Sequence, residues 1–282
     1  MSEKDIYDLG LPADLQMWQQ SPLNRRRFLK MGLASMLVVL AGCQTDGSEA
    51  ATETATTESS SESTNSAAVC VDPIPSETAG PYPADGSQAS NQTLNALALA
   101  GIVRSDIRTS LGTGNTATGI PCNIELTLVN TNADCAPLAG HALYIWHCDQ
   151  AGNYSLYSSD AVAEDYLRGV QVSDSDGKVN FVSVFPACYA GRWPHAHFEI
   201  YRSLDEATSA ANVLHTSQLA LPEDTCDLVY ATDGYTQSVR NLAQLSLATD
   251  NVFRDGVDSQ LAAVTGDNDA GYTVRLTVGV PA

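Results

Sequence analysis

Basic side chains are scarce in this sequence. The 282 residues include 14 Lys and Arg against 33 Asp and Glu, which gives a formal net charge of −19. Five of the basic residues precede Cys43, so a chain cleaved at that point would be even more acidic. A surface of this sign repels nucleic acid phosphates and anionic lipid headgroups. We therefore expect no nucleic acid partner.

Long apolar runs are also missing. The apolar run 31–41 is much shorter than the roughly 20 residues that span a bilayer. It follows the basic stretch 24–30 (NRRRFLK), which resembles a twin-arginine export signal, and it leads into LAGC at residues 40–43, which matches a bacterial lipobox. A buried helix with a chance Cys is the alternative. The order and spacing of the three features favour an export signal over residues 1–43.

This interpretation predicts where the mature protein resides. Cleavage before Cys43 would leave a lipid on its thiol and hold the protein at a membrane surface, in the periplasm or outside the cell. Residues 44–69 are mostly Ser, Thr, Glu and Ala. They have too little apolar surface to fold, so they are expected to form a disordered tether.

Residues 70–282 have the composition of one folded domain. Short segments rich in β-branched, aliphatic and aromatic residues, separated by turn sequences, predict an all-β sandwich. A helical pattern occurs only near the C-terminus, at residues 238–249 and 257–264. The expected strands cover residues 124–129, 142–146, 181–185, 195–201, 213–219 and 272–278.

Six cysteines remain if Cys43 carries the lipid. An even number in an exported chain is consistent with three disulfides, for which 15 pairings exist. No Cys-x-x-Cys spacing favours thiolate metal ligands. We expect Cys148 to pair with Cys188, and Cys122 with Cys135.

The sequence contains only five histidines, and two of them are spaced as a pair. His195 and His197 lie in an expected strand, where residues two apart point to the same face. A zinc or cupin-type iron site would add Glu199 and His215 to this pair. A ferric site would instead add phenolates from Tyr154 and Tyr189, because only a strongly Lewis-acidic ion displaces a phenol proton with a pKa of about 10.

Several motifs together resemble the intradiol ring-cleavage dioxygenases, the family of catechol 1,2-dioxygenase and protocatechuate 3,4-dioxygenase. They occur in the family's order within residues 76–219, about half the chain. The motifs are ETAGPY at 77–82, WHCD at 146–149, GNYS at 152–155, YLRGVQ at 166–171, DSDG at 174–177, FPACYAGR at 185–192 and PHAHF at 194–198.

The resemblance implies a role for individual residues. Tyr154, Tyr189, His195 and His197 match the family's four ligands of non-haem Fe(III). Arg192 matches the arginine beside the substrate, and Gln218 the glutamine on the oxygen side. Tyr82 and Trp193 are expected to contact the substrate. Cys188 and Trp193 depart from the usual motif residues, which leaves the choice of diol open.

The resemblance also implies a reaction in aromatic compound catabolism. A small aromatic diol and dioxygen would be the substrates, a cyclic anhydride the intermediate and a cis,cis-muconate the product. Tyr189 is expected to leave the metal when the diol binds, and Arg192 to stabilise negative charge on the ring. A non-catalytic exported β-sandwich that binds polyphenols or catecholates, or a cupin-like metal protein, is the alternative. The oligomeric state is left open.

Overall fold

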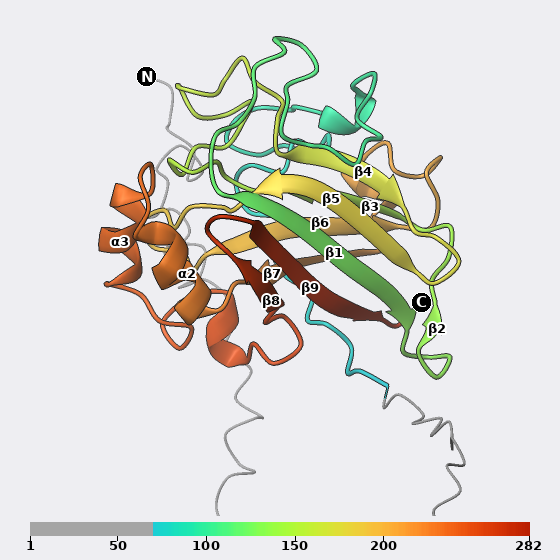
Figure 1. The fold of residues 1–282 in the computed structure, drawn as a ribbon. Helices are drawn as coiled ribbons and strands as arrows, with labels where there is room; N and C mark the ends of the chain where they lie inside the picture. The colour runs from blue at the N-terminus through green and yellow to red at the C-terminus, as the bar shows by residue number, and fades with distance from the viewer. Residues whose placement is uncertain (1–69) are drawn as a thin grey trace, which may run out of the picture. The chain divides into compact units, whose positions relative to one another are not determined.

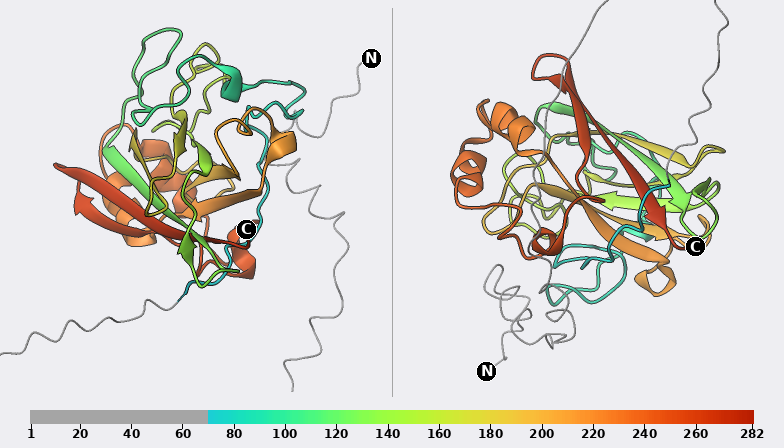
Figure 2. Two further views of the ribbon diagram at one scale, coloured as in Figure 1. Left: turned by 90° about the vertical axis from the view of Figure 1, so that its right-hand side faces the viewer. Right: turned by 90° about the horizontal axis from the view of Figure 1, so that it is seen from below.

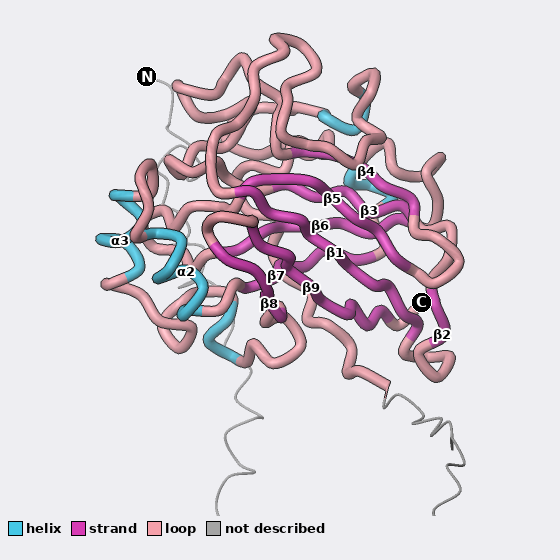
Figure 3. The backbone as a smooth tube through the Cα atoms, viewed as in Figure 1, coloured by secondary structure: helices cyan, strands magenta, loops and turns pink. Residues whose placement is uncertain are grey.

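A computed structural model describes residues 70–282 of the chain. The export signal expected over residues 1–43, the lipid site expected at Cys43 and the tether expected over residues 44–69 lie outside the described residues. Strands and long connecting loops make up most of the described chain, and the helices are short (Figure 3). Among residues 70–282, no helix is long and apolar enough to cross a membrane.

The first of two β-sheets has the order β2-β1-β9-β8, and β5 pairs with β1 outside this path. Strands β1 and β9 are parallel, whereas the other pairs in this sheet are antiparallel. In Figure 1 the long strands β1, β5 and β9 cross the front of the molecule. The strands are β1 (Pro121–Asn130), β2 (Ala136–Pro137), β5 (Lys178–Val184), β8 (Ala263–Asp267) and β9 (Gly271–Val280).

The second sheet has four antiparallel strands in the order β4-β3-β6-β7. Two facing sheets with few helices confirm the expected β-sandwich. The strands are β3 (Ala142–Trp146), β4 (Arg168–Val172), β6 (His195–Tyr201) and β7 (His215–Ala220).

Alternating apolar side chains fill the space between the sheets. Leu126 of β1, Phe181 of β5 and Phe198 of β6 are fully buried in one cluster. Burying side chains of this size stabilises the fold by about 1.5–3 kcal/mol each. The other face of the second sheet is buried as well, because the long loops pack over it (Figure 2). Strand β6 is therefore enclosed on both faces, and the side that carries His195 and His197 faces the loops.

Helices α2 and α3 lie together at one end of the sheets (Figure 1). Helix α3 (Thr236–Leu242) overlaps the helical segment expected at 238–249, but helix α2 (Glu223–Tyr230) was not expected. The helix expected at 257–264 is wrong. There the backbone of residues 260–262 bonds to Ala220 at the edge of β7, and β8 begins at Ala263. Single 3-10 turns occur at η2 (Ala96–Ala98), η3 (Ala210–Asn212) and η4 (Phe253–Asp255).

The cysteine pairing differs from the expectation. One disulfide joins Cys70 to Cys135, with the Cα atoms 5.4 Å apart. Cys122, Cys148, Cys188 and Cys226 are free and buried, so the expected pairs Cys148–Cys188 and Cys122–Cys135 are wrong. Cys122 points into the core from β1, whereas Cys135 lies in the turn between β1 and β2, beside the start of the described chain.

Candidate metal centre

Four side chains meet at the beginning of β6. The Nε2 atom of His195 lies 3.0 Å from Nε2 of His197, 3.3 Å from the hydroxyl of Tyr189 and 3.5 Å from the hydroxyl of Tyr154. Donor atoms that surround one ion at about 2.0–2.1 Å are separated by about 3 Å or slightly more. The structure thus brings together all four residues that the sequence suggested as ligands.

A hydrogen bond holds the imidazole of His195 in the form that binds a metal. His195 Nδ1 donates a hydrogen bond to the carbonyl of Trp193, which leaves the Nε2 lone pair facing the other three donors. Burial, and then the positive charge of Arg192, lowers the pKa of His195 well below its usual value. Burial also lowers the pKa of His197, whose ring stacks on Trp146 with centroids 5.0 Å apart. Both rings are therefore neutral.

A tight loop after β3 presents Tyr154. The carboxylate of Asp149 accepts hydrogen bonds from the backbone N–H groups of Ala151 and Asn153, both at 2.9 Å. Gly152 has a φ of +90°, and a Cβ at this position would lie 3.2 Å from the Cβ of Tyr189. The glycine therefore allows the loops that carry the two tyrosines to touch.

The side chain of Tyr154 is shielded from water. Tyr154 is buried, and its pKa is raised well above the usual value by burial first and by Tyr189 second. A phenol in this setting ionises only beside a strong positive charge. That property suits a ferric ion, whose charge compensates two phenolates.

Helix α3 holds the loop that carries Tyr189. The backbone N–H of Cys188 donates to the hydroxyl of Ser238 at 3.0 Å, and the side-chain amide of Asn241 donates to the carbonyl of Cys188 at 2.7 Å. Both contacts fix the residue immediately before Tyr189. The helices beside the sandwich thus contribute to the site by positioning one of its donors.

The loop 77–83 covers the same site. The ring of Tyr82 lies 4.8 Å from that of Tyr154. The buried Arg168 secures the loop, because its guanidinium donates to the carbonyls of Tyr82 and Pro83, each at 2.9 Å. Gly80 has a φ of +72°, and a Cβ there would lie 3.3 Å from Cε1 of His197. This loop therefore shields the imidazole from water.

Replacing Gly80 by alanine tests how closely this loop fits the site. Gly140 has a similar φ of +78° but has open space where a Cβ would stand, so Gly140→Ala is a matched control. Each substitution is expected to lower the free energy of unfolding by about 1 kcal/mol through backbone strain. Only Gly80→Ala should also displace His197 and weaken metal binding, as measured by equilibrium dialysis. Equal metal affinity in the two variants would contradict the described contact.

A buried ion pair lies beside the four donors. The guanidinium of Arg192 is held by Asp250, with Nε 3.0 Å from the carboxylate. Burial opposes the charge on Arg192, but Tyr189, Asp250 and Tyr154 raise its pKa, so it remains a cation. Its Nη2 donates to Oε1 of Gln218 at 2.7 Å. Gln218 is opposite His197 in the register between β6 and β7, so both side chains face the site.

Two residues outside the four donors, Trp193 and His147, are buried and hydrogen-bonded within the protein. The indole of Trp193 is buried in the core, and its N–H donates to the carbonyl of Leu221 at 2.9 Å. His147 is a hydrogen-bonding core residue, because both of its ring nitrogens have partners in Cys148 and Ser183.

The ligands of a zinc or cupin site are not assembled. His215 is opposite Ile200 in the strand register and therefore points away from the face that carries His197. Glu199 shares that face, but its carboxylate accepts a hydrogen bond from the hydroxyl of Tyr201 at 2.7 Å. Within residues 70–282, no group of three or more His, Cys, Asp and Glu is placed to hold a metal ion.

Sequence reasoning missed two residues that organise the site. Asp250 follows Arg192 by 58 residues and lies in no recognisable motif, so no local signal could have found it. Arg168 is fully buried, and it lies within the YLRGVQ motif. A charged residue inside a motif that otherwise fits a strand was the available signal.

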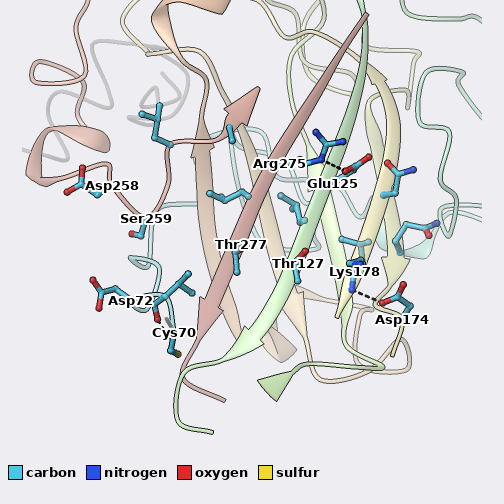
Figure 4. A pocket seen from close by; sticks show the side chains of 18 of the residues that line it. Cys70, Asp72, Glu125, Thr127, Asp174, Lys178, Asp258, Ser259, Arg275 and Thr277 are labelled. Carbon is cyan, nitrogen blue, oxygen red and sulfur yellow. Dashed lines mark hydrogen bonds and ion pairs between the residues drawn. The ribbon is translucent and has the colours of Figure 1, made fainter. Parts of the chain in front are cut away.

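A surface groove among residues 70–282 lies elsewhere. It covers about 1160 Å³ over the outward face of β1, β5 and β9 and includes the exposed pair of Arg275 and Glu125 (Figure 4). None of its lining residues belongs to the group of donors. The donors instead lie beneath the loops, where burial strengthens electrostatic interactions.

The fold and the site together define a class: a β-sandwich with a Tyr₂His₂ centre beside a buried cation. Residues 105–234 match the family model described as "Dioxygenase". An intradiol ring-cleavage dioxygenase from Tetranychus urticae has a similar structure, with a TM-score of 0.56 and 25% identity over 75% of this chain and 96% of that chain. A second dioxygenase structure has a TM-score of 0.52 and 25% identity over 66% of this chain and 91% of that chain.

A curated relative gives a shorter match. Catechol 1,2-dioxygenase from Candida albicans is 26% identical over 85 residues, which are 30% of this chain and 28% of that protein. The match thus spans less than a third of the curated relative. The family model, the solved structures and this relative together make the chain similar to the intradiol ring-cleavage dioxygenases.

Proposed function

We propose that this protein is a non-haem Fe(III) dioxygenase that cleaves a catechol-type diol to a cis,cis-muconate-type product. The observation that supports it most is the convergence of two phenol oxygens and two imidazole nitrogens on one point. Tyr154, Tyr189, His195 and His197 would hold the metal. Ferric iron would act there as a Lewis acid that polarises the bound diol towards dioxygen.

Tyr189, Arg192 and Gln218 would have separate roles beside the metal. Tyr154 is fully buried, whereas Tyr189 is partly exposed, so Tyr189 is the phenol better placed to accept a proton from an incoming diol. Arg192 would stabilise negative charge that develops on the ring, since its cation is fixed and shielded from water. Gln218 is held on the same side by the carbonyl of Thr78, at 2.9 Å.

Oxygen uptake by the purified, iron-loaded protein tests this proposal. With catechol, hydroxyquinol or a chlorinated catechol, we expect one dioxygen consumed per diol and a ring-opened dicarboxylic acid detected by mass spectrometry. Protein stripped of iron is the control and should consume no oxygen. An iron-loaded protein that binds diols but leaves them intact would favour the alternative, a non-catalytic polyphenol-binding protein.

We further propose that the protein works outside the cytoplasm on a lipid anchor at Cys43. The disulfide between Cys70 and Cys135 supports this location, because such bonds persist in oxidising compartments. Mass spectrometry of the mature N-terminus checks it. A lipid-modified Cys43 is the expected result, and an intact residue 1–43 segment on the mature protein would contradict the proposal.

A further inference from the structure

A chain of hydrogen bonds leads from Arg192 to Glu77. Nη2 of Arg192 donates to the side-chain oxygen of Gln218 at 2.7 Å. The backbone carbonyl of Gln218 accepts from Nε2 of Gln260 at 3.1 Å, and the same nitrogen lies 3.4 Å from the carboxylate of Glu77. The backbone N–H of Glu77 donates to Thr216 at 2.9 Å, which fixes this residue beside β7.

The side chain of Gln260 has an unused acceptor at this place. Gln260 is fully buried, and its Nε2 contacts both Glu77 and Gln218. Its Oε1 accepts no hydrogen bond from any side chain or backbone group of residues 70–282. Buried acceptors are nearly always paired. This oxygen therefore suits a ligand group, or a water, that donates a hydrogen bond.

Negative charge gathers around the same amide. Burial, and next the charge of Asp255, raises the pKa of Glu77 to about 7, while Gln260 and Arg192 lower it in part. Asp250 also raises the pKa of Glu77, but it already forms the ion pair with Arg192. Glu77 therefore gains its negative charge as the pH rises through about 7.

We propose that Glu77, Asp255 and Gln260 select the substrate by its ring substituent. Together they would exclude diols that bear a carboxylate and favour diols that bear a hydrogen-bond donor, above all a cationic ammonium group. A carboxylate offers only acceptors, so it would meet the Gln260 oxygen and two like charges without gaining a partner. This inference rests on the proposed function, because it assigns a substrate class to that same site.

Two diols of nearly equal size and opposite charge test the inference. Iron-loaded protein without oxygen is titrated by calorimetry with 3,4-dihydroxybenzylamine and with 3,4-dihydroxybenzoate. At pH 8 we expect the amine to bind at least about tenfold more tightly, since unit charges in a partly buried site interact by about 1 kcal/mol or more. Glu77→Gln should reduce the ratio of the two dissociation constants about tenfold.

A pH series gives a second readout that needs no variant. The wild-type preference should grow between pH 6 and pH 8, because Glu77 gains its charge through about pH 7. The preference of Glu77→Gln should be flatter over this range. A carboxyl whose pKa is raised on folding opposes folding when ionised, so Glu77→Gln is expected to remain folded at pH 8.

The control removes a carboxylate far from this cluster. Glu125 lies on the outward face of β1 beside Arg275, so Glu125→Gln should keep the wild-type ratio of dissociation constants (Figure 4). If both diols bind and the ratio of their dissociation constants is the same in wild type and Glu77→Gln, this inference alone is overturned. Binding of no diol at all overturns the proposed function and this inference with it.

Discussion

Replacing Tyr154 by phenylalanine is expected to weaken iron binding by more than about 100-fold, since changes even outside the ligand shell cost 10–100-fold. The phenylalanine ring keeps the packing against Tyr82, whose ring lies 4.8 Å away, but removes the buried oxygen that faces His195. Diol cleavage should fall below detection. Metal analysis after dialysis, together with the visible spectrum, measures the first effect, and oxygen uptake the second.

Tyr272→Phe is the matched control for this experiment. The hydroxyl of Tyr272 donates to Asn268 at 3.0 Å, at the turn between β8 and β9. Its loss should leave iron content and turnover unchanged. The free energy of unfolding should change by about 1 kcal/mol or less in both variants. A Tyr154→Phe protein that retains wild-type iron content would contradict the assignment of Tyr154 as a ligand.

Replacing Asp250 by asparagine should destabilise the fold by about 3–5 kcal/mol, the cost of leaving a buried charge without its partner. Asp250 is fully buried, and besides Arg192 its carboxylate accepts from the backbone N–H groups of Trp193 at 2.7 Å and Val252 at 2.8 Å. The variant turns an N–H₂ group towards some of these donors. Urea denaturation measures the change in the free energy of unfolding.

The substitution should also lower the catalytic efficiency, because Asp250 positions the cation of Arg192. We expect the kcat/KM of Asp250→Asn to fall more steeply than its iron content. Glu125→Gln breaks an ion pair of similar length, 2.7 Å, whose side chains are 50% and 42% exposed. That control should cost less than about 1 kcal/mol, as exposed pairs usually do. Equal losses of stability in the two variants would show that the buried pair has no special role.

The sequence was most informative where side chains alternate strictly. The segment 195–201 places His195 and His197 on one face and Phe198 on the other, and β6 has those bounds. Strand β4 was missed because Arg168 and Gly169 break the expected pattern. Arg168 is nevertheless buried, and its guanidinium donates hydrogen bonds to the backbone carbonyls of residues 82–83. The helix expected at 257–264 failed because pairing with β7 outweighed local propensity.

The ligand set could be derived from the sequence only as alternatives. Spacing alone left His215 and Glu199 as possible partners of the histidine pair, and the strand register shows that His215 faces away. The ion pair of Arg192 with Asp250 and the disulfide of Cys70 with Cys135 join residues 58 and 65 positions apart. Such long-range contacts depend on the packing of the whole sandwich, which no local pattern encodes.

The visible absorption spectrum of the purified protein, recorded with its iron content, tests the central claim most directly. Phenolate oxygens of Tyr154 and Tyr189 on ferric iron should give a burgundy protein with one iron per chain, because tyrosinate transfers charge to Fe(III) under visible light. Diol addition without oxygen should shift the band. A folded, colourless protein that fails to take up ferric iron would contradict the account.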